Sequence, residues 1–241
     1  MHNLILLRHG QSVWNLENRF TGWIDVPLSA NGVNEARYAG KILRDSAYVF
    51  DHAFTSYLGR AQQTLEIVLQ EMNHRSIPKT LDWRLNERHY GALQGLDKEE
   101  TASEHGMEQV LKWRRSFSTR PPELSDDDPT HPANDAAYAN LIKVPNGESL
   151  ADTLVRVKEC WEEYLVPAIN NNRRLLVVAH GNSLRALMKL LENLSEDEIL
   201  NRDIPTAMPL RYKLNNDLSV LKTSFLVETE ELEAAMKRAR G

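Results

Sequence analysis

The sequence predicts an α/β fold: a three-layer sandwich with a mainly parallel central sheet flanked by helices, plus an inserted subregion over one end of the sheet. Short apolar runs alternate along the chain with segments whose apolar residues recur at helical spacing. The runs Leu4–Leu7 and Leu175–Ala179 are wholly apolar, as is typical of strands buried on both faces. A chain of 241 residues is long enough for a sizeable core. We expect one domain over residues 1–241.

The predicted elements follow one another in the order that such a sandwich requires. The first strand begins almost at the first residue, and the turn Leu28–Gly32 offers a helix cap. Pro167 and the asparagines at 170–172 are expected to close the longest helical pattern. The predicted strands are 4–7, 53–56 and 175–179, and the predicted helices are a segment reaching about 44, then 65–72, 150–165, 184–191 and 228–240.

The middle of the chain, residues 84–147, has a different character. It holds the proline-rich and acidic stretch Pro121–Pro129 and lacks the regular alternation found on either side of it. We interpret it as an insertion of loops and short helices within the single domain. Residues 228–241 are expected to form a charged C-terminal tail.

Composition and charge narrow the classes of function. The net charge of −5 makes the protein a poor candidate for non-specific binding to nucleic acid, because an acidic chain repels polyanions. No run approaches the roughly 20 apolar residues of a membrane span. The first apolar run is too short for the core of a signal peptide. Cys160 is the single cysteine, which excludes an internal disulfide. We therefore expect a cytoplasmic protein with no nucleic-acid or membrane partner.

Two of the predicted strands lead into a histidine that is followed by glycine. His9 and Gly10 follow the first strand, and His180 and Gly181 follow the strand at 175–179. In open α/β sheets, ligands bind beyond the carboxyl ends of the strands. If these two strands are neighbours, both imidazoles face one pocket. A lone histidine at a strand end is more often structural, but the repeated arrangement favours a site.

Arginines complete the pattern that an anion site requires. Arg8 adjoins the first strand, Arg60 follows the second, and Arg114 and Arg115 lie in the insertion. Guanidinium groups bind phosphate in a bidentate fork and stay charged at every relevant pH. A protein with a net charge of −5 needs such local positive charge if its substrate is an anion.

Five segments carry the most distinctive residue patterns: Arg8–Asn15, Phe20–Trp23, Leu85–Gly95, Trp113–Phe117 and His180–Arg185. Together they closely resemble the cofactor-dependent phosphoglycerate mutases of the histidine phosphatase superfamily. The resemblance runs from about residue 3 to residue 226. The first and last segments mark the superfamily, whereas the segments at 85–95 and 113–117 are much more specific to the mutases.

The resemblance implies an isomerase that interconverts 3-phosphoglycerate and 2-phosphoglycerate in glycolysis and gluconeogenesis. His9 would be the phosphorylated nucleophile, and Arg8, Arg60 and His180 would stabilise charge on the transferring phosphoryl group. A neutral imidazole is a competent nucleophile, and neighbouring arginines favour its neutral form. Glu87 would be the general acid and base that moves the proton of the substrate hydroxyl.

The resemblance also implies a priming cofactor, an assembly and a set of binding residues. 2,3-Bisphosphoglycerate would supply the first phosphoryl group, no metal would be needed, and the protein would be a homodimer acting on small phosphoglycerates. The substrate-binding residues would be Arg8, Gly10, Gln11, Ser12, Asn15, Thr21, Gly22, Arg60, Glu87, Arg88, His89, Tyr90, Lys98, Arg114, Arg115, Gly181 and Asn182.

Some positions depart from the mutase pattern. Gly59 stands where a lysine is expected and Ala207 where a glycine is expected. Neither change removes a catalytic group, although both bear on the rigidity of loops. Beyond Leu226 the chain no longer follows the family closely. Because family tails fold over the active site, the tail bears on how the site is gated.

Other interpretations stay open. A phosphatase of the same superfamily would pass the phosphoryl group of a small phosphorylated metabolite to water, and a bisphosphoglycerate mutase or synthase is a closer variant. Lys98 and the segment Trp113–Arg115 favour a mutase, because they can hold a second acidic group. A metal site at the two histidines lacks a supporting ligand spacing, and the flanking arginines would repel a cation. A binding module without catalysis would not need a nucleophile, an arginine clamp and a proton carrier together.

Overall fold

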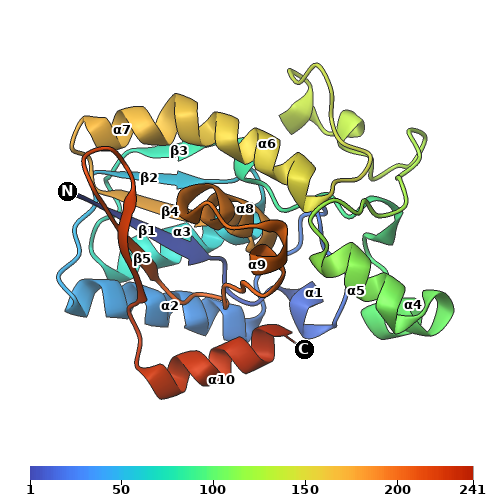
Figure 1. The fold of residues 1–241 in the computed structure, drawn as a ribbon, viewed down its shortest axis with the longest axis horizontal. Helices are drawn as coiled ribbons and strands as arrows, with labels where there is room; N and C mark the ends of the chain where they lie inside the picture. Colours follow the sequence, from blue (N-terminus) through green and yellow to red (C-terminus); the bar gives the residue numbers. More distant parts are fainter. Residues whose placement is uncertain (241) are drawn as a thin grey trace.

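The computed structural model describes residues 1–240, and Gly241, the last residue of the predicted tail, lies outside them. Within this range six strands form one sheet in the order β3-β2-β4-β1-β5-β6 (Figure 1). The strands are β1 (His2–Arg8), β2 (His52–Thr55), β3 (Lys79–Leu81), β4 (Leu175–Ala179), β5 (Leu210–Leu214) and β6 (Val220–Phe225). Neighbours from β3 to β1 pair in parallel, whereas β5 pairs antiparallel with β1 and β6 antiparallel with β5. The predicted α/β class with a mainly parallel sheet is confirmed.

The strands that sequence reasoning missed lie toward the edges of the sheet. β3 is only three residues long, and β6 is largely exposed. In β5 the buried residues alternate with half-buried ones. Strands of this kind lack the continuous apolar run that a doubly covered central strand shows, so they give a weaker signal.

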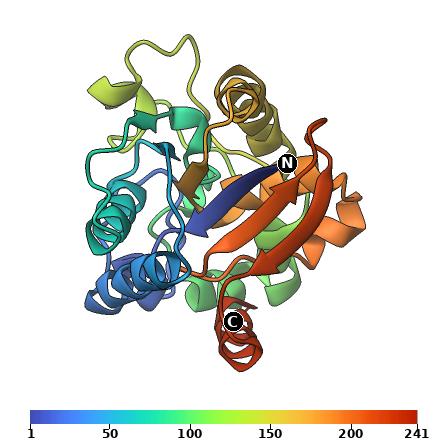
Figure 2. The ribbon, with the colours of Figure 1, turned by 90° about the vertical axis from the view of Figure 1, so that its left-hand side faces the viewer.

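Helices cover both faces of the sheet (Figure 2). Successive residues of a strand point to opposite faces, so β1 contributes Leu4 and Leu6 to one core and Ile5 and Leu7 to the other. All four side chains are fully buried, and burying each one contributes about 1.5–3 kcal/mol of transfer free energy. The first core lies under α6 (Leu150–Cys160) and α8 (Gly181–Glu192), and the second lies under α2 (Ala30–Asp45) and α3 (Gly59–Glu71).

The caps of the two longest predicted helical patterns are serines. Ser29 accepts a hydrogen bond from Gly32 N at the start of α2, within the turn predicted at 28–32.

The sequence predicted that the helical pattern at 150–165 would end at Pro167, but the helix continues past this residue. After α6 the chain makes one π-helical turn at 161–165 and continues as α7 (Val166–Asn170). Because Pro167 lies at the first turn of α7, its missing N–H breaks no ladder hydrogen bond there.

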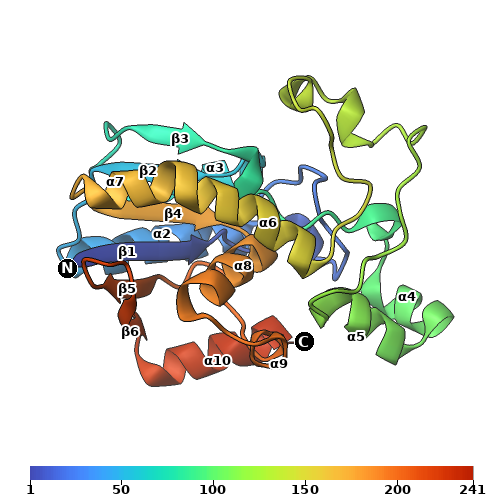
Figure 3. The same ribbon diagram turned by 45° about the horizontal axis from the view of Figure 1, so that its top comes forward.

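The insertion lies beyond the carboxyl ends of the parallel strands (Figure 3). It consists of loops and short helices, and its residues Leu93, Val110 and Trp113 form a small apolar cluster with Phe20 from the N-terminal part of the chain. Its helices are α4 (Lys98–His105) and α5 (Met107–Arg115), with single 3₁₀ turns η1 (Trp83–Leu85), η2 (Gly91–Leu93), η3 (Pro132–Asn134) and η4 (Ala136–Tyr138). Two further short helices are α1 (Val13–Leu16) and α9 (Glu196–Leu200).

The charged tail forms α10 (Thr229–Arg240), which agrees with the helix predicted there. It is tied to α2 by the hydroxyl of Tyr38, which donates to Oε2 of Glu231 at 2.9 Å. Among residues 1–240, no helix is long and apolar enough to cross a membrane.

Candidate active site

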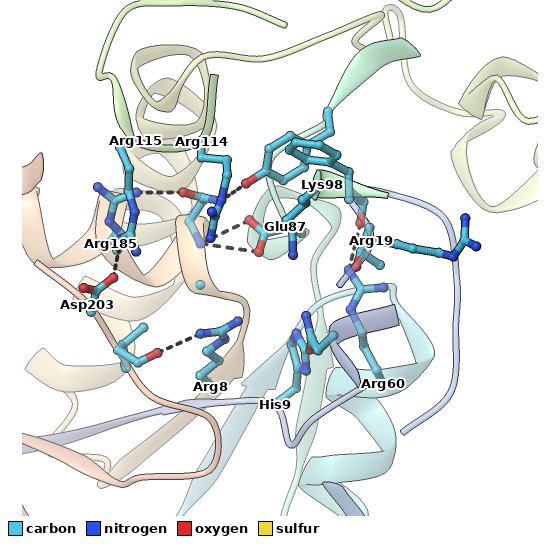
Figure 4. A pocket seen from close by; sticks show the side chains of 18 residues that line it. Arg8, His9, Arg19, Arg60, Glu87, Lys98, Arg114, Arg115, Arg185 and Asp203 are labelled. Carbon is cyan, nitrogen blue, oxygen red and sulfur yellow. Dashed lines mark hydrogen bonds and ion pairs between the residues drawn. The ribbon is translucent and has the colours of Figure 1, made fainter. Parts of the chain in front are cut away.

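The sheet brings His9 and His180 together. β1 and β4 are adjacent parallel strands with Arg8 opposite Ala179, and His9 N donates to Ala179 O at 3.0 Å. The two imidazole rings lie 4.9 Å apart between centroids and are tilted by 59°. Both side chains are buried. Two histidines separated widely in the sequence therefore meet at the carboxyl edge of the sheet (Figure 4).

The hydrogen bonding of His9 leaves one ring nitrogen free to react. Nδ1 of His9 lies 2.7 Å from Gly10 O, and since a carbonyl can only accept, Nδ1 carries the proton. Nε2 of the neutral ring then holds a lone pair. Burial holds the pKa of His9 well below its usual value of 6.5, and the charges of Arg60 and Arg8 lower it further. His9 is thus a neutral imidazole with a nucleophilic Nε2 at physiological pH.

His180 is held by a residue that follows the neighbouring strand β2. Ser56 Oγ and His180 Nε2 are hydrogen-bonded at 2.7 Å. Burial lowers the pKa of His180 well below 6.5, with Arg60 and His9 adding to the shift. Nδ1 of His180 is buried and has no hydrogen-bond partner within the described part of the chain.

The guanidinium groups of Arg8 and Arg60 are fixed by backbone carbonyls. Arg8 Nη1 donates to Ile204 O at 3.0 Å, and Arg60 Nη2 donates to Gly22 O at 2.8 Å. Nε of each arginine is buried and has no hydrogen-bond partner among the groups that the structure describes. Together with Nδ1 of His180, these atoms are buried polar groups that an anion would satisfy. The donors are preorganised around His9, which is what stabilisation of a transferring phosphoryl group requires.

Glu87 places a carboxylate in the same cavity. Its side chain accepts hydrogen bonds from Arg88 N at 2.7 Å and from Asn182 N at 3.1 Å. Asn182 lies in the first turn of α8, and helix N-termini favour a negative charge. A carboxylate beside the nucleophile can exchange a proton with a bound hydroxyl.

A second group of cations lines the cavity from the insertion. Lys98 begins α4, and Arg114 and Arg115 end α5. Figure 4 shows Arg114 and Arg115 entering from one side of the cavity while Arg8, His9 and Arg60 enter from the other. Arg115 forms an ion pair with Asp203, whereas neither Lys98 nor Arg114 makes an ion pair with any side chain that the structure describes. Lys98 and Arg114 are therefore two cations of the cavity wall that could bind a second anionic group.

Most of the predicted site residues line one cavity with His9. The described residues that line it include Arg8, His9, Asn15, Thr21, Gly22, Arg60, Glu87, Tyr90, Lys98, Arg114, Arg115, Gly181 and Asn182. The lining set does not include Gly10, Gln11, Ser12, Arg88, His89 or His180, although His180 lies directly against His9.

The predicted residues outside the lining have other contacts. Gly10 packs so closely that a Cβ there would lie 2.3 Å from Gly32 O. Ser12 caps α1, and Gln11 accepts from Ser29 Oγ at 2.8 Å. Arg88 is fully buried and donates from Nη2 to Tyr90 OH and to Arg114 O, both at 2.9 Å. His89 Nδ1 accepts from Gly91 N at 3.0 Å. None of these residues lines the cavity that contains His9, although Gln11 lines an adjoining pocket that shares Arg8, Lys98 and Arg114 with it.

Several lining residues were missed by sequence reasoning. Arg19, Arg185 and Asp203 line the cavity, and Ser56 orients His180 from behind it. A signal existed for two of them. Arg185 lies one helical turn from Asn182, to which it donates at 2.9 Å, and Ser56 follows a strand just as His9 does. Nothing local marks Asp203, because its ion pair with Arg115 joins distant segments.

The two departures from the mutase pattern have visible consequences. Ala207 adopts φ +50°, in the left-handed region that favours glycine, and its N–H donates to Arg8 O at 2.9 Å. Gly59 N donates to Asp25 Oδ1 at 2.8 Å, and a Cβ at Gly59 would lie 2.9 Å from Asp25 Oδ2. Neither Gly59 nor Ala207 lines the cavity that contains His9.

The arrangement has the parts of a phosphoryl-transfer site that works through a phosphohistidine. A neutral imidazole, preorganised cationic donors and a carboxylate share one cavity. Among the described residues, no group of three or more His, Cys, Asp or Glu side chains is arranged to hold a metal ion.

A family model of the histidine phosphatase superfamily (branch 1) matches residues 4–224. The chain belongs to this superfamily. It is accordingly an enzyme of phosphoryl transfer or hydrolysis.

Solved structures of the histidine phosphatase fold cover nearly all of the chain. A mycobacterial glucosyl-3-phosphoglycerate phosphatase in complex with VO3 is similar at a TM-score of 0.71 and 22% identity, over 95% of this chain and 99% of that one. The Bacillus stearothermophilus protein YhfR is similar at 0.66 and 25%, over 91% and 94%. The alpha-ribazole phosphatase from Shigella flexneri is similar at 0.65 and 20%, over 90% and 93%. These likenesses establish a common fold.

Proposed function

We propose that the protein interconverts 3-phosphoglycerate and 2-phosphoglycerate through a phosphohistidine at His9. The proposal rests on one observation: a single cavity contains two sets of cationic side chains and the carboxylate of Glu87. Arg8 and Arg60 flank the nucleophile, while Lys98 and Arg114 line the cavity from the insertion. A phosphomonoesterase needs only the first group. A mutase must also hold the second acidic group of its substrate while the phosphoryl group changes position.

In the proposed reaction, Glu87 carries the proton of the substrate hydroxyl and His9 carries the phosphoryl group. The 2-hydroxyl of 3-phosphoglycerate gives its proton to Glu87, and its oxygen attacks the phosphorus on Nε2 of His9. The N–P bond breaks and its electron pair returns to the imidazole. After the bound molecule reorients, Nε2 attacks the other phosphoryl group, and Glu87 returns the proton to the departing oxygen. Atoms and charge balance over the cycle.

His9 must first be phosphorylated. When bound, 2,3-bisphosphoglycerate would supply that phosphoryl group, and the residues present fit it. Arg8 and Arg60 would hold one phosphate, and Lys98 with Arg114 would hold the other. We include independence of metal ions in the proposal, because the arginines supply the positive charge that a metal would otherwise provide.

The priming step gives a direct test. Enzyme that has lost its phosphoryl group through prolonged incubation should not convert 3-phosphoglycerate until a trace of 2,3-bisphosphoglycerate is added. The rate should then saturate with the amount added. Full activity of dephosphorylated enzyme without any bisphosphate would overturn the proposal.

A second candidate is hydrolysis of a small phosphorylated metabolite. What favours it is that two of the similar structures are named as phosphatases, and the core of the site would be the same. Water would then attack phospho-His9 and release inorganic phosphate. The two candidates differ in the ratio of isomerisation to phosphate release, and in how strongly each depends on Arg114.

A further inference from the structure

We propose that the buried ion pair of Glu148 and Arg156 is a positioning device that fixes Glu87 for proton transfer without touching substrate. This inference rests on the proposed role of Glu87 as proton carrier. Both side chains are buried, at 4% and 5% exposure. Neither residue is among the described residues that line the cavity. Two charges have thus been removed from water close to the site without contributing to its wall.

The segment that carries Glu87 has no regular backbone support. It runs between the 3₁₀ turns η1 and η2, so no helix or sheet ladder fixes it. A carbonyl in such a segment must find its partner elsewhere. The carbonyl of Glu87 is met by two side chains: Trp23 Nε1 donates to it at 2.6 Å, and Arg156 Nη2 donates to it at 2.9 Å.

The guanidinium group of Arg156 donates to backbone carbonyls of this segment and to the carboxylate of Glu148. Nη1 donates to Arg84 O at 2.7 Å and to Asn86 O at 2.9 Å, and Nη2 donates to Glu87 O. The remaining N–H groups go to Glu148, with Nε to Oε1 at 2.7 Å and Nη2 to Oε2 at 2.8 Å. A guanidinium has five N–H donors, and these bonds account for all of them. Arg156 therefore has no donor left for a substrate.

Glu148 closes the arrangement from the other side of Glu87. Its Oε2 accepts from His89 N at 2.8 Å, and its own N–H donates to His89 O at 2.8 Å. Glu148 and Arg156 thus form hydrogen bonds with the backbone before, at and after Glu87. Glu148 also neutralises a charge that would otherwise stand unpaired in the interior. Both residues are anchored by α6, since Glu148 precedes its cap Ser149 and Arg156 lies within it.

The physical consequence is control of where the carboxyl group of Glu87 lies. A displacement of about 1 Å of a catalytic group can cost on the order of 100-fold in rate. Lysine at position 156 keeps the positive charge but cannot reach three carbonyls and a carboxylate at once. Glutamine at position 148 keeps the shape but weakens the grip on the guanidinium.

The test uses the leaving group to separate positioning of Glu87 from general damage. A glycerate oxygen needs a proton as it departs, whereas p-nitrophenolate leaves without one, so only the first reaction depends on a well-placed acid. In Arg156→Lys, transfer of labelled phosphoryl from 2,3-bisphosphoglycerate to His9 should slow by about 10–100-fold. The pre-steady-state burst of p-nitrophenolate from p-nitrophenyl phosphate, which reports the same phosphorylation of His9, should change far less.

Parallel variants make every outcome decisive. Glu87→Gln should show the same selectivity, Glu148→Gln should show a smaller version of it, and Arg211→Lys should show none. Arg211 is a matched control, because it is a half-buried arginine on β5 that donates to Tyr48 and Ser224 away from the site. If Glu87→Gln is selective but Arg156→Lys and Glu148→Gln slow both reactions equally, the positioning role is wrong while that of Glu87 stands. If Glu87→Gln is not selective either, the proton role and the positioning role both fall.

Discussion

The imidazole rings of His9 and His180 lie 4.9 Å apart between centroids, yet each ring uses a different nitrogen for its hydrogen bond to the protein. His9 donates from Nδ1 to the backbone of Gly10 and keeps Nε2 for chemistry, whereas His180 engages Nε2 with Ser56 and keeps Nδ1 unpaired among the described residues. The difference assigns them different tasks. His9 is the candidate nucleophile, and His180 is a candidate donor to the transferring oxygens.

Labelling should identify the nucleophile. After brief exposure to bisphosphoglycerate with a labelled phosphoryl group, one acid-labile and base-stable label should appear in the peptide that contains His9, because a phosphoramidate is labile in acid. His180→Ala should slow the labelling while leaving its position unchanged. Label that persists in a His9→Ala variant would falsify the assignment of His9.

Stability should fall as the solution is acidified below the usual histidine pKa. Burial holds the pKa values of His9 and His180 well below 6.5, and lowers that of His89 to about 3. These histidines therefore bind protons near pH 6.5 in the unfolded chain but stay neutral at that pH in the folded protein. The stability from each neutral ring is complete above pH 6.5 and is lost as pH falls toward the folded pKa, at up to about 1.4 kcal/mol per pH unit.

Denaturant unfolding between pH 7.5 and pH 5 checks this dependence. The free energy of unfolding should decline over that range, and His180→Asn should make the decline shallower than in the wild type. An equal slope in the variant would mean that His180 binds its proton in the folded state, contrary to its burial.

Lys98 should give the site an alkaline limit. Burial lowers the pKa of Lys98 to about 8, and the charge of Arg114 adds to the shift. The ammonium group is charged below that pH and loses its charge above it. We expect kcat/KM for phosphoglycerate to decline above pH 8, since this ratio reports the free enzyme. Lys98→Arg, which stays charged, should hold kcat/KM level to higher pH; the same decline in that variant would exclude Lys98 as its source.

Arg114 and Arg115 should matter more for isomerisation than for simple hydrolysis. Replacing both by alanine removes cations from the insertion side of the cavity but leaves Arg8 and Arg60 in place. Turnover of phosphoglycerate should fall by about 10²–10³-fold, the usual scale for a lost charge-stabilising donor. Hydrolysis of p-nitrophenyl phosphate, which has no second acidic group, should fall much less. Equal losses on both substrates would place these arginines outside substrate recognition.

The sequence was sufficient for the central fold because the central strands are buried on both faces. The apolar runs of β1 and β4 and the periodic helices around them contain their own signal. The same runs placed His9 and His180 at one edge of the sheet, which needed only that the strands be neighbours. β5 and β6, by contrast, pair through alternating or exposed residues and give no continuous run.

What the sequence could not supply were contacts that join distant segments. The ion pair of Arg115 with Asp203, and that of Arg156 with Glu148 around Glu87, depend on how the insertion and α6 pack. A buried arginine and an exposed one look alike in a helical pattern. The continuation of the helix through Pro167 likewise depends on a π-helical turn that no local rule announces.

The most direct test of the account is a product analysis of 3-phosphoglycerate incubated with the protein and a trace of 2,3-bisphosphoglycerate. ³¹P spectroscopy separates 2-phosphoglycerate from inorganic phosphate in one sample. A site that holds two acidic groups and keeps water from phospho-His9 should form 2-phosphoglycerate faster than it releases phosphate by orders of magnitude. Phosphate released about as fast as 2-phosphoglycerate forms, or with no 2-phosphoglycerate at all, would contradict the mutase and establish hydrolysis in its place.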